Sequence, residues 1–252
     1  MSRMVALLYG LVCYSLFGLV SIWAMAFLGN FLPSGSIDSP ARITWPLALT
    51  INLGLLVLFA LQHSIMARPW FKRSWTKVVP EPVERSTYVL FSCVALGVLI
   101  YCWQPMGGTV WQVQSPLLRT VLYALFFGGW LTIVATSFLI NHFDLFGLRQ
   151  VWLYYQGRPY THLPFKTPGV YRWVRHPLYV GWLLTFWAAP TMTISHLVFA
   201  LGTTAYILIA IVFEERDLLT YHGELYAKYR QRTPMLLPWF KSRPAKETKA
   251  FV

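Results

Sequence analysis

The chain has 252 residues, of which 56% are hydrophobic and only 12% are charged. A soluble domain carries about 25% charged residues, so this composition excludes an ordinary soluble protein and indicates a membrane protein. The formal net charge of +12 then suits lipid headgroups and membrane orientation better than nucleic acid. The three cysteines lie inside apolar segments without ligand-like spacing, which indicates neither disulfides nor a metal site.

Four apolar stretches are long enough to cross a bilayer as helices, which takes about 20 residues. We expect these spans near residues 5–31, 43–66, 86–103 and 119–141. A fifth stretch, residues 178–213, is too long for one span and carries Pro190 near its middle. It predicts a hairpin of two short helices, roughly 178–192 and 196–213, although Pro190 could instead kink a single helix.

Lysine and arginine concentrate in alternate connections between these stretches. The segments 67–85 and 142–177 and the tail after residue 213 are rich in them, whereas the connection 32–42 holds only Arg42. The positive-inside rule therefore places these basic segments and both termini in the cytoplasm. Such a topology needs an even number of crossings, which the hairpin supplies. A re-entrant hairpin that does not fully cross would leave the tail on the same side.

Polar pairs stand at both ends of the predicted hairpin. Arg175 and His176 precede it, and Glu214 and Glu215 end it. An interfacial basic anchor and a solvated helix end would explain the two pairs separately. Folded together, they predict a site for a zwitterionic ligand. In such a site Arg175 binds a carboxylate and His176 donates to a neutral ligand atom. One glutamate binds an ammonium or ribose hydroxyls, and the other orients the Arg or His partners.

Further candidates flank this site. Gly181, one turn into the hairpin, would let a flat ligand approach the backbone. His222, Tyr226 and Tyr229 follow at helical spacing, although an aromatic stripe alone more often packs than binds a ligand. The tail 214–232 predicts an amphipathic helix that continues from the hairpin.

These motifs together carry a resemblance. An R-H-P-x-Y-x-G run at 175–181, a spacer ending in Glu-Glu, an H-G-x-x-Y-x-x-Y run at 222–229 and then Pro234 follow in order. This pattern resembles the C-terminal half of the isoprenylcysteine carboxyl methyltransferase and phospholipid methyltransferase superfamily, small integral membrane enzymes that use S-adenosylmethionine. The run 141–152 is similar to one branch, the bacterial methanethiol S-methyltransferases, which make dimethyl sulfide.

The resemblance implies a fold and a set of partners. The fold is an all-α, polytopic membrane helix bundle of five to six spans, the last pair a hairpin, with a cytoplasmic cofactor-binding cap. It forms one domain, with a transmembrane bundle at 1–141, a catalytic region at 142–234 and a basic tail at 235–252, of which we expect 241–252 to be disordered. The bacterial inner membrane is the implied location. The implied partners are S-adenosylmethionine, methanethiol and membrane lipid, without nucleic acid or metal.

The resemblance also implies the residues that contact S-adenosylmethionine. They are Arg175, His176, Tyr179, Gly181, Glu214, Glu215, His222 and Tyr226. Two alternatives stay open. One is methyl transfer to a lipid, an isoprenylated molecule or another small thiol. The other is a membrane subunit or transporter without enzymatic activity, in which Arg175 and Glu215 pair only with each other.

The acceptor side has its candidates at the exit of the fourth span, at His142, Asp144 and Arg149. An aspartate beside aromatic residues at membrane depth is unusual. It predicts that Asp144 holds the imidazole of His142 while His142 takes the thiol proton. Residues two apart do not face each other on a regular helix, so this pair requires the helix to unwind near His142, and Gly147 favours such a break. Alternatively, Asp144 caps a short helix and His142 lies among lipid headgroups.

Overall fold

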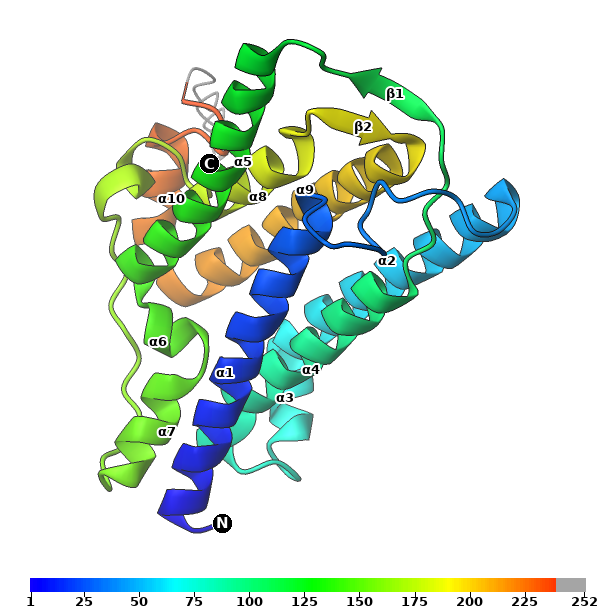
Figure 1. Ribbon diagram of the computed structural model, residues 1–252. Helices are drawn as coiled ribbons and strands as arrows, with labels where there is room; N and C mark the ends of the chain where they lie inside the picture. The colour runs from blue at the N-terminus through cyan, green and yellow to red at the C-terminus, as the bar shows by residue number, and fades with distance from the viewer. Residues whose placement is uncertain (239–252) are drawn as a thin grey trace, which may run out of the picture.

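The computed structural model describes residues 1–238. Most of the predicted basic tail, with the predicted disorder over 241–252, lies outside these residues. Five helices within them are long and apolar enough to cross a membrane. They are α1 (Arg3–Leu28), α2 (Trp45–Ala67), α4 (Glu81–Cys102), α5 (Pro116–Ile140) and α9 (Ile194–His222). The first four match the predicted spans, so an integral membrane helix bundle is confirmed (Figure 1).

Short elements join these spans. Five are α-helices, one is a 3-10 helix and two are strands. They are α3 (Pro69–Trp75), α6 (His142–Leu145), α7 (Leu148–Tyr155), η1 (Gly169–Arg172), α8 (Pro177–Trp187), α10 (Glu224–Arg232), β1 (Thr109–Gln112) and β2 (Thr191–Thr193). The two strands pair antiparallel, and they have no counterpart in the sequence prediction.

The predicted hairpin is present as α8 and α9, which pack against each other. Its two arms are unequal. Helix α8 has 11 residues and is about 16 Å long, roughly half of a bilayer core of about 30 Å. Helix α9 has 29 residues and continues past the predicted end at 213 as far as His222. The single amphipathic helix predicted over 214–232 is broken at Gly223, which has a φ of +52°.

The tip of the hairpin reaches one end of the bundle, which we call the ribbon end. There β2 pairs with β1 from the α4–α5 connection. The α1–α2 connection meets the same point, because Asp38 accepts a hydrogen bond from the Thr193 amide at 3.2 Å and lies 3.0 Å from His196 Nδ1. Three connections that are far apart in the sequence are therefore tied together at this end.

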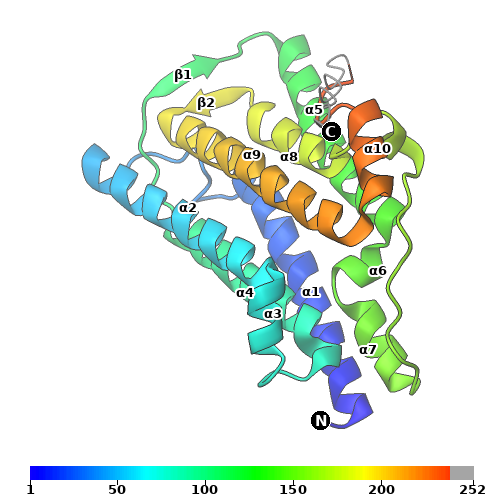
Figure 2. The same ribbon diagram turned by 180° about the vertical axis from the view of Figure 1, so that it is seen from behind.

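The opposite end, which we call the basic end, is tied by side chains from other connections. Arg68, at the end of α2, forms an ion pair with Asp217 of α9 at 2.8 Å. Arg85 of α4 donates to the Leu145 carbonyl oxygen at 2.7 Å. All Lys and Arg of residues 1–238 except Arg42 and Arg119 belong to segments at this end. Figure 2 shows α2 and α9 beside each other on the far face of the bundle.

Helices α5 and α8 cross closely because each has a glycine at the contact. A Cβ atom on Gly181 would lie 2.8 Å from the Gly129 carbonyl oxygen, and a Cβ atom on Gly129 would lie 2.7 Å from the Gly181 carbonyl oxygen. Small residues of this kind allow close backbone approach between helices in membranes. The crossing fixes the start of α8 near the basic end, where the polar pairs of the hairpin meet.

Candidate active site

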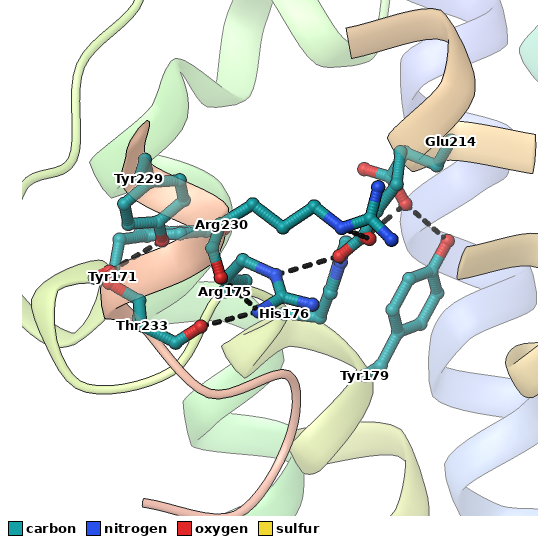
Figure 3. A network of polar contacts seen from close by, with 9 residues as sticks. Tyr171, Arg175, His176, Tyr179, Glu214, Tyr229, Arg230 and Thr233 are labelled. Atoms are coloured by element: carbon teal, nitrogen blue, oxygen red, sulfur yellow. Dashed lines mark hydrogen bonds and ion pairs between the residues drawn. The ribbon is translucent and has the colours of Figure 1, made fainter. Parts of the chain in front are cut away.

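The start of α8 and the last turns of α9 bring the predicted polar pairs together. Arg175 Nε donates to Glu215 Oε1 at 2.7 Å, and His176 Nε2 lies 3.1 Å from the same oxygen. The Tyr179 hydroxyl donates to Glu214 Oε2 at 2.9 Å. Figure 3 shows these side chains converging from the two helices. The hairpin thus joins residues that stand 35 to 40 positions apart in the sequence.

Glu215 lies at the centre of this cluster. Its side chain is only 8% exposed, and its second oxygen, Oε2, lies 3.0 Å from Arg230 Nε of α10. Together with Arg175 and His176, three donors from two segments converge on one buried carboxylate. A buried charge is tolerated when it is paired and hydrogen-bonded in this way. Glu215 therefore clamps the start of α8, the end of α9 and α10 together.

Arg175 is a buried part of the same clamp. Its Nη1 atom donates to the carbonyl oxygens of Arg230, at 3.0 Å, and Thr233. Its backbone amide donates to the Pro234 carbonyl at 2.9 Å. The sequence predicted that the Arg175 fork binds a ligand carboxylate. The structure corrects this interpretation, because Nε and Nη1 already hold Glu215 and the segment 233–235, which we call the C-terminal strap.

Glu214 differs from its neighbour. Its side chain is 43% exposed, against 8% for Glu215. One oxygen, Oε2, accepts from Tyr179 and lies 3.7 Å from His176 Nδ1. Adjacent residues on a helix point about 100° apart, which lets one glutamate orient the basic partners while the other faces accessible space. The sequence predicted such a division, and the geometry gives the orienting position to Glu215.

Tyr226 of α10 is almost completely buried, at 1% exposure. Its hydroxyl has no hydrogen-bond partner within residues 1–238. Burial raises the pKa of this phenol, and the nearby charge of Glu215 raises it further, so the hydroxyl stays protonated. The hydroxyl oxygen is fully enclosed, so Tyr226 contributes to the buried wall of the clamp beside Glu215.

Two predicted cofactor contacts lie elsewhere. Gly181 faces Gly129 of α5, so its missing side chain serves the helix crossing, and the ligand approach there stays a prediction. His222 lies with its ring 5.0 Å from Phe165, which also lies 5.9 Å from the ring of Tyr226. The structure groups His222 with this aromatic cover rather than with Arg175 and Glu215.

Three residues of the cluster were not singled out from the sequence. Thr233 supplies a carbonyl to Arg175, and Arg230 an ion pair to Glu215. The Tyr171 carbonyl accepts from the Tyr229 hydroxyl at 2.5 Å. Arg230 was counted only as a basic tail charge. Its position four residues after Tyr226 places both on one face of a helix, and this spacing was the available signal.

The exit of the fourth span breaks where the sequence predicted. Helix α5 ends at Ile140, Asn141 has a φ of +106°, and α6 begins at His142. The imidazole then turns back into the bundle. Its Nδ1 lies 2.8 Å from Ser137 Oγ and its Nε2 lies 2.7 Å from the hydroxyl of Tyr14 on α1. Burial lowers the pKa of His142, so the ring is neutral between two hydroxyls.

Asp144 does not hold His142, and the predicted His142–Asp144 pair is wrong. The Asp144 carboxylate accepts from Arg149 Nη1 at 2.9 Å and from the Tyr160 hydroxyl at 3.3 Å. Arg149 also donates to the Thr161 carbonyl at 2.8 Å. Asp144 and Arg149 therefore tie α6 and α7 to the loop that follows them. The break after α5 lets the His142 imidazole turn away from Asp144. Its two ring nitrogens are within hydrogen-bond distance of Tyr14 and Ser137 instead.

The comparisons with known proteins agree with this architecture. A model of the NnrU protein family matches residues 51–236. The methanethiol S-methyltransferase of Crocosphaera subtropica is 52% identical over 95% of this chain and 94% of its own length. That of Mycobacterium tuberculosis is 47% identical over 95% and 98%. Nurim of Xenopus laevis is 30% identical over 78% and 74%, and no solved structure matches. With this identity along nearly its whole length, the chain belongs to the methanethiol S-methyltransferases of the NnrU family.

Proposed function

We propose that this protein is an integral membrane enzyme that transfers a methyl group from S-adenosylmethionine to methanethiol and releases dimethyl sulfide. The names of the relatives that align along 94–98% of their own lengths supply the reaction. The single structural observation that carries it is the buried clamp around Glu215, with the half-exposed Glu214 beside it. A pairing of Arg175 with Glu215 alone would also suit a membrane subunit. The additional donors and the separate Glu214 favour a ligand site.

The residues fit the polar head of S-adenosylmethionine. The Glu214 carboxylate suits its ammonium group or its ribose hydroxyls, and Tyr179 and His176 hold that carboxylate in place. Tyr226, enclosed beside Glu215, completes this side of the proposed site. Glu215 and Arg175 form the wall behind them. When bound, S-adenosylmethionine supplies a methyl group on a positively charged sulfur, which a thiolate attacks.

His142, Asp144 and Arg149 have a different place in this proposal. His142 is only 7% exposed, between Tyr14 and Ser137. Asp144 and Arg149 brace the segment after α5. We assign these three residues to the wall of the catalytic region 142–234, which the bundle 1–141 supports. We assign proton transfer to another group.

The proposed location is the bacterial cytoplasmic membrane, with both termini in the cytoplasm. The concentration of Lys and Arg at the basic end supports this orientation. Methanethiol is small and apolar, so it reaches a site at this depth through the lipid. The tightness of the acceptor pocket, rather than binding energy, must then exclude larger thiols.

The test uses purified full-length protein in lipid nanodiscs. We expect S-adenosylhomocysteine to bind by calorimetry, and dimethyl sulfide to appear in the headspace when methanethiol and S-adenosylmethionine are added. Glu214→Gln should weaken S-adenosylhomocysteine binding about tenfold or more, as for a lost hydrogen bond to a charged group. His162→Gln, at an exposed histidine, is the matched control. Absence of binding would favour the non-enzymatic subunit, and binding without dimethyl sulfide would favour a lipid or isoprenylated acceptor.

A further inference from the structure

A second polar cluster lies between α2, α4 and α9, and the proposed function leaves it without a role. Polar side chains from three spans meet inside an otherwise apolar bundle, where they are costly unless they have a function. We call this group the His63 cluster. Its members are His63, Ser64, Tyr88, Ser92 and Tyr206.

Hydrogen bonds within the cluster fix the protonation of His63. The hydroxyl of Ser92 donates its one proton to the Tyr88 carbonyl at 2.9 Å. Ser92 Oγ also lies 3.2 Å from His63 Nδ1, so here it must accept, and Nδ1 carries the hydrogen. The unprotonated nitrogen is then Nε2, with the Tyr88 hydroxyl 3.0 Å away. The same hydroxyl lies 3.1 Å from Nδ1, so Tyr88 covers the edge of the ring that carries both nitrogens. A histidine whose Nδ1–H is held by an oxygen and whose Nε2 is unprotonated has the tautomer of a general base, and here Tyr88 is the group that a ligand would displace from Nε2.

The side chain of His63 faces the interior of the bundle but is not completely buried. It lies on the same side of α2 as Asn52, Leu56 and Met66, all of which are buried. The imidazole itself is only half-buried. His63 is thus an inward-facing side chain that keeps partial exposure. His142 and His196, at 7% and 1% exposure, have no comparable access.

Aromatic rings surround the imidazole of His63. Phe59 stacks on the imidazole at 5.5 Å and 17°, and Tyr206 stands edge-on at 6.4 Å and 79°. This is an apolar setting with one basic nitrogen. It suits a small, uncharged thiol, because aromatic rings contact the methyl group and the imidazole meets the S–H bond.

The His63 cluster lies deeper in the bundle than the site proposed for the polar head of S-adenosylmethionine. The Arg68–Asp217 ion pair fixes the end of α2 at the level of Glu214, which is three residues before Asp217. His63 precedes Arg68 by five residues, so it lies about 7 Å deeper along α2. Ser64 Oγ lies 3.3 Å from the Tyr206 hydroxyl, which links α2 to the same helix that carries Glu214. Figure 2 shows α2 and α9 side by side along this path.

We propose that His63 is the base that deprotonates the thiol acceptor, an inference that rests on the proposed function. The S–H bond breaks, its proton moves to Nε2, and the electron pair stays on sulfur as the thiolate. Ser92 holds Nδ1–H throughout and supports the imidazolium, which later releases its proton to water. With S-adenosylmethionine bound, the thiolate would bond to the methyl carbon as the sulfonium–methyl bond breaks, and S-adenosylhomocysteine would be the leaving group.

The charges around His63 suit this step. Arg68, on its own helix, and Arg85, on α4, act on the imidazole. Arg68 is paired with Asp217 of α9, and Arg85 lies over the Tyr88 ring at 4.9 Å. Tyr88 and Tyr206 are the other titratable groups that face the ring. The two nearby cations would stabilise the thiolate that the step forms.

The experiment compares His63→Gln with wild-type protein in nanodiscs. Dimethyl sulfide formation at neutral pH should fall about 10²–10⁴-fold, as on removal of a general base. S-adenosylhomocysteine affinity should stay within about twofold. The loss should shrink as the pH rises toward the pKa of the thiol, and it should shrink for thiol acceptors of lower pKa. Ser92→Ala is the second variant. It keeps the imidazole, and it should lower turnover and shift the acidic limb of the pH profile while binding is retained.

Each outcome of this experiment supports or refutes His63 as the base. His162→Gln, at an exposed histidine, should behave as wild type. Full turnover in His63→Gln, or a loss that high pH does not relieve, overturns the assignment. A parallel fall in S-adenosylhomocysteine affinity would place His63 on the donor side. Should His63→Gln fail to bind because it does not fold, an unchanged pH profile in Ser92→Ala refutes the base. Wild-type protein that makes no dimethyl sulfide refutes the proposed function itself.

Discussion

At the scale of single residues, two adjacent glutamates have opposite surroundings. Glu215 is enclosed by Arg175, His176 and Arg230, whereas Glu214 is half-exposed beside Tyr179. The sequence could predict that both belong to one site, because the hairpin length brings them to Arg175. It could not assign their roles, since these depend on which way α9 faces α10. The same limit explains His142, whose partner Tyr14 lies 128 residues away.

The contrast between the glutamates predicts that replacing Glu215, but not Glu214, lowers the stability of the protein. Glu215→Gln leaves the buried guanidinium of Arg175 without its counter-charge. Breaking a buried ion pair from one side typically costs about 3–5 kcal/mol. We expect a clearly lower unfolding temperature in nanodiscs for Glu215→Gln. Glu214→Gln should unfold close to wild type. Equal stability of the two variants would show that the clamp does not hold the three helices.

At the scale of elements, the crossing of α5 and α8 positions the start of α8. The predicted spans and the hairpin followed from apolar length and Pro190. The β-ribbon did not, because strands of four and three residues carry no periodic signal. The continuation of α9 past residue 213 agrees with the helix predicted over 214–232. Its end at His222 and the break at Gly223 were not predicted.

The α5–α8 crossing predicts the effect of adding a methyl group at Gly181. Gly128, which precedes the contact residue Gly129 on α5, provides the control. In Gly181→Ala the new Cβ would lie 2.8 Å from the Gly129 carbonyl oxygen, so α5 and α8 must move apart. Such overpacking costs about 1–3 kcal/mol, and it should weaken S-adenosylhomocysteine binding by displacing His176 and Tyr179. At Gly128 a Cβ meets nothing within 4 Å. Gly128→Ala should therefore be neutral or slightly stabilising. Thermal unfolding and calorimetry of both variants provide the comparison.

At the scale of the whole molecule, the two ends differ in charge and in construction. The ribbon end is closed by paired strands and by Asp38, and the basic end carries the proposed site. The distribution of Lys and Arg predicted the difference in charge but not the paired strands that close the ribbon end. The sequence could not locate the His63 cluster, because its members come from three spans and no motif joins them.

Orientation is tested by single cysteines in a background with Cys102→Ser, since Cys13 and Cys93 are buried. Thr76→Cys lies at the basic end and Val110→Cys at the ribbon end, and both positions are exposed. In intact cells an impermeant maleimide should label Val110→Cys and spare Thr76→Cys until the membrane is opened. The opposite labelling pattern would place the proposed site outside the cytoplasm.

The C-terminal strap has a consequence for the order of synthesis. Arg175 leaves the ribosome long before Thr233 and Pro234. Its guanidinium donates to the Thr233 carbonyl, and its backbone amide donates to the Pro234 carbonyl. All five spans are therefore made while this buried arginine still lacks part of its shell. A chain halted before residue 233 would be a complete bundle without a finished clamp. Capture of nascent chains on immobilised S-adenosylhomocysteine should accordingly begin only after the strap has emerged.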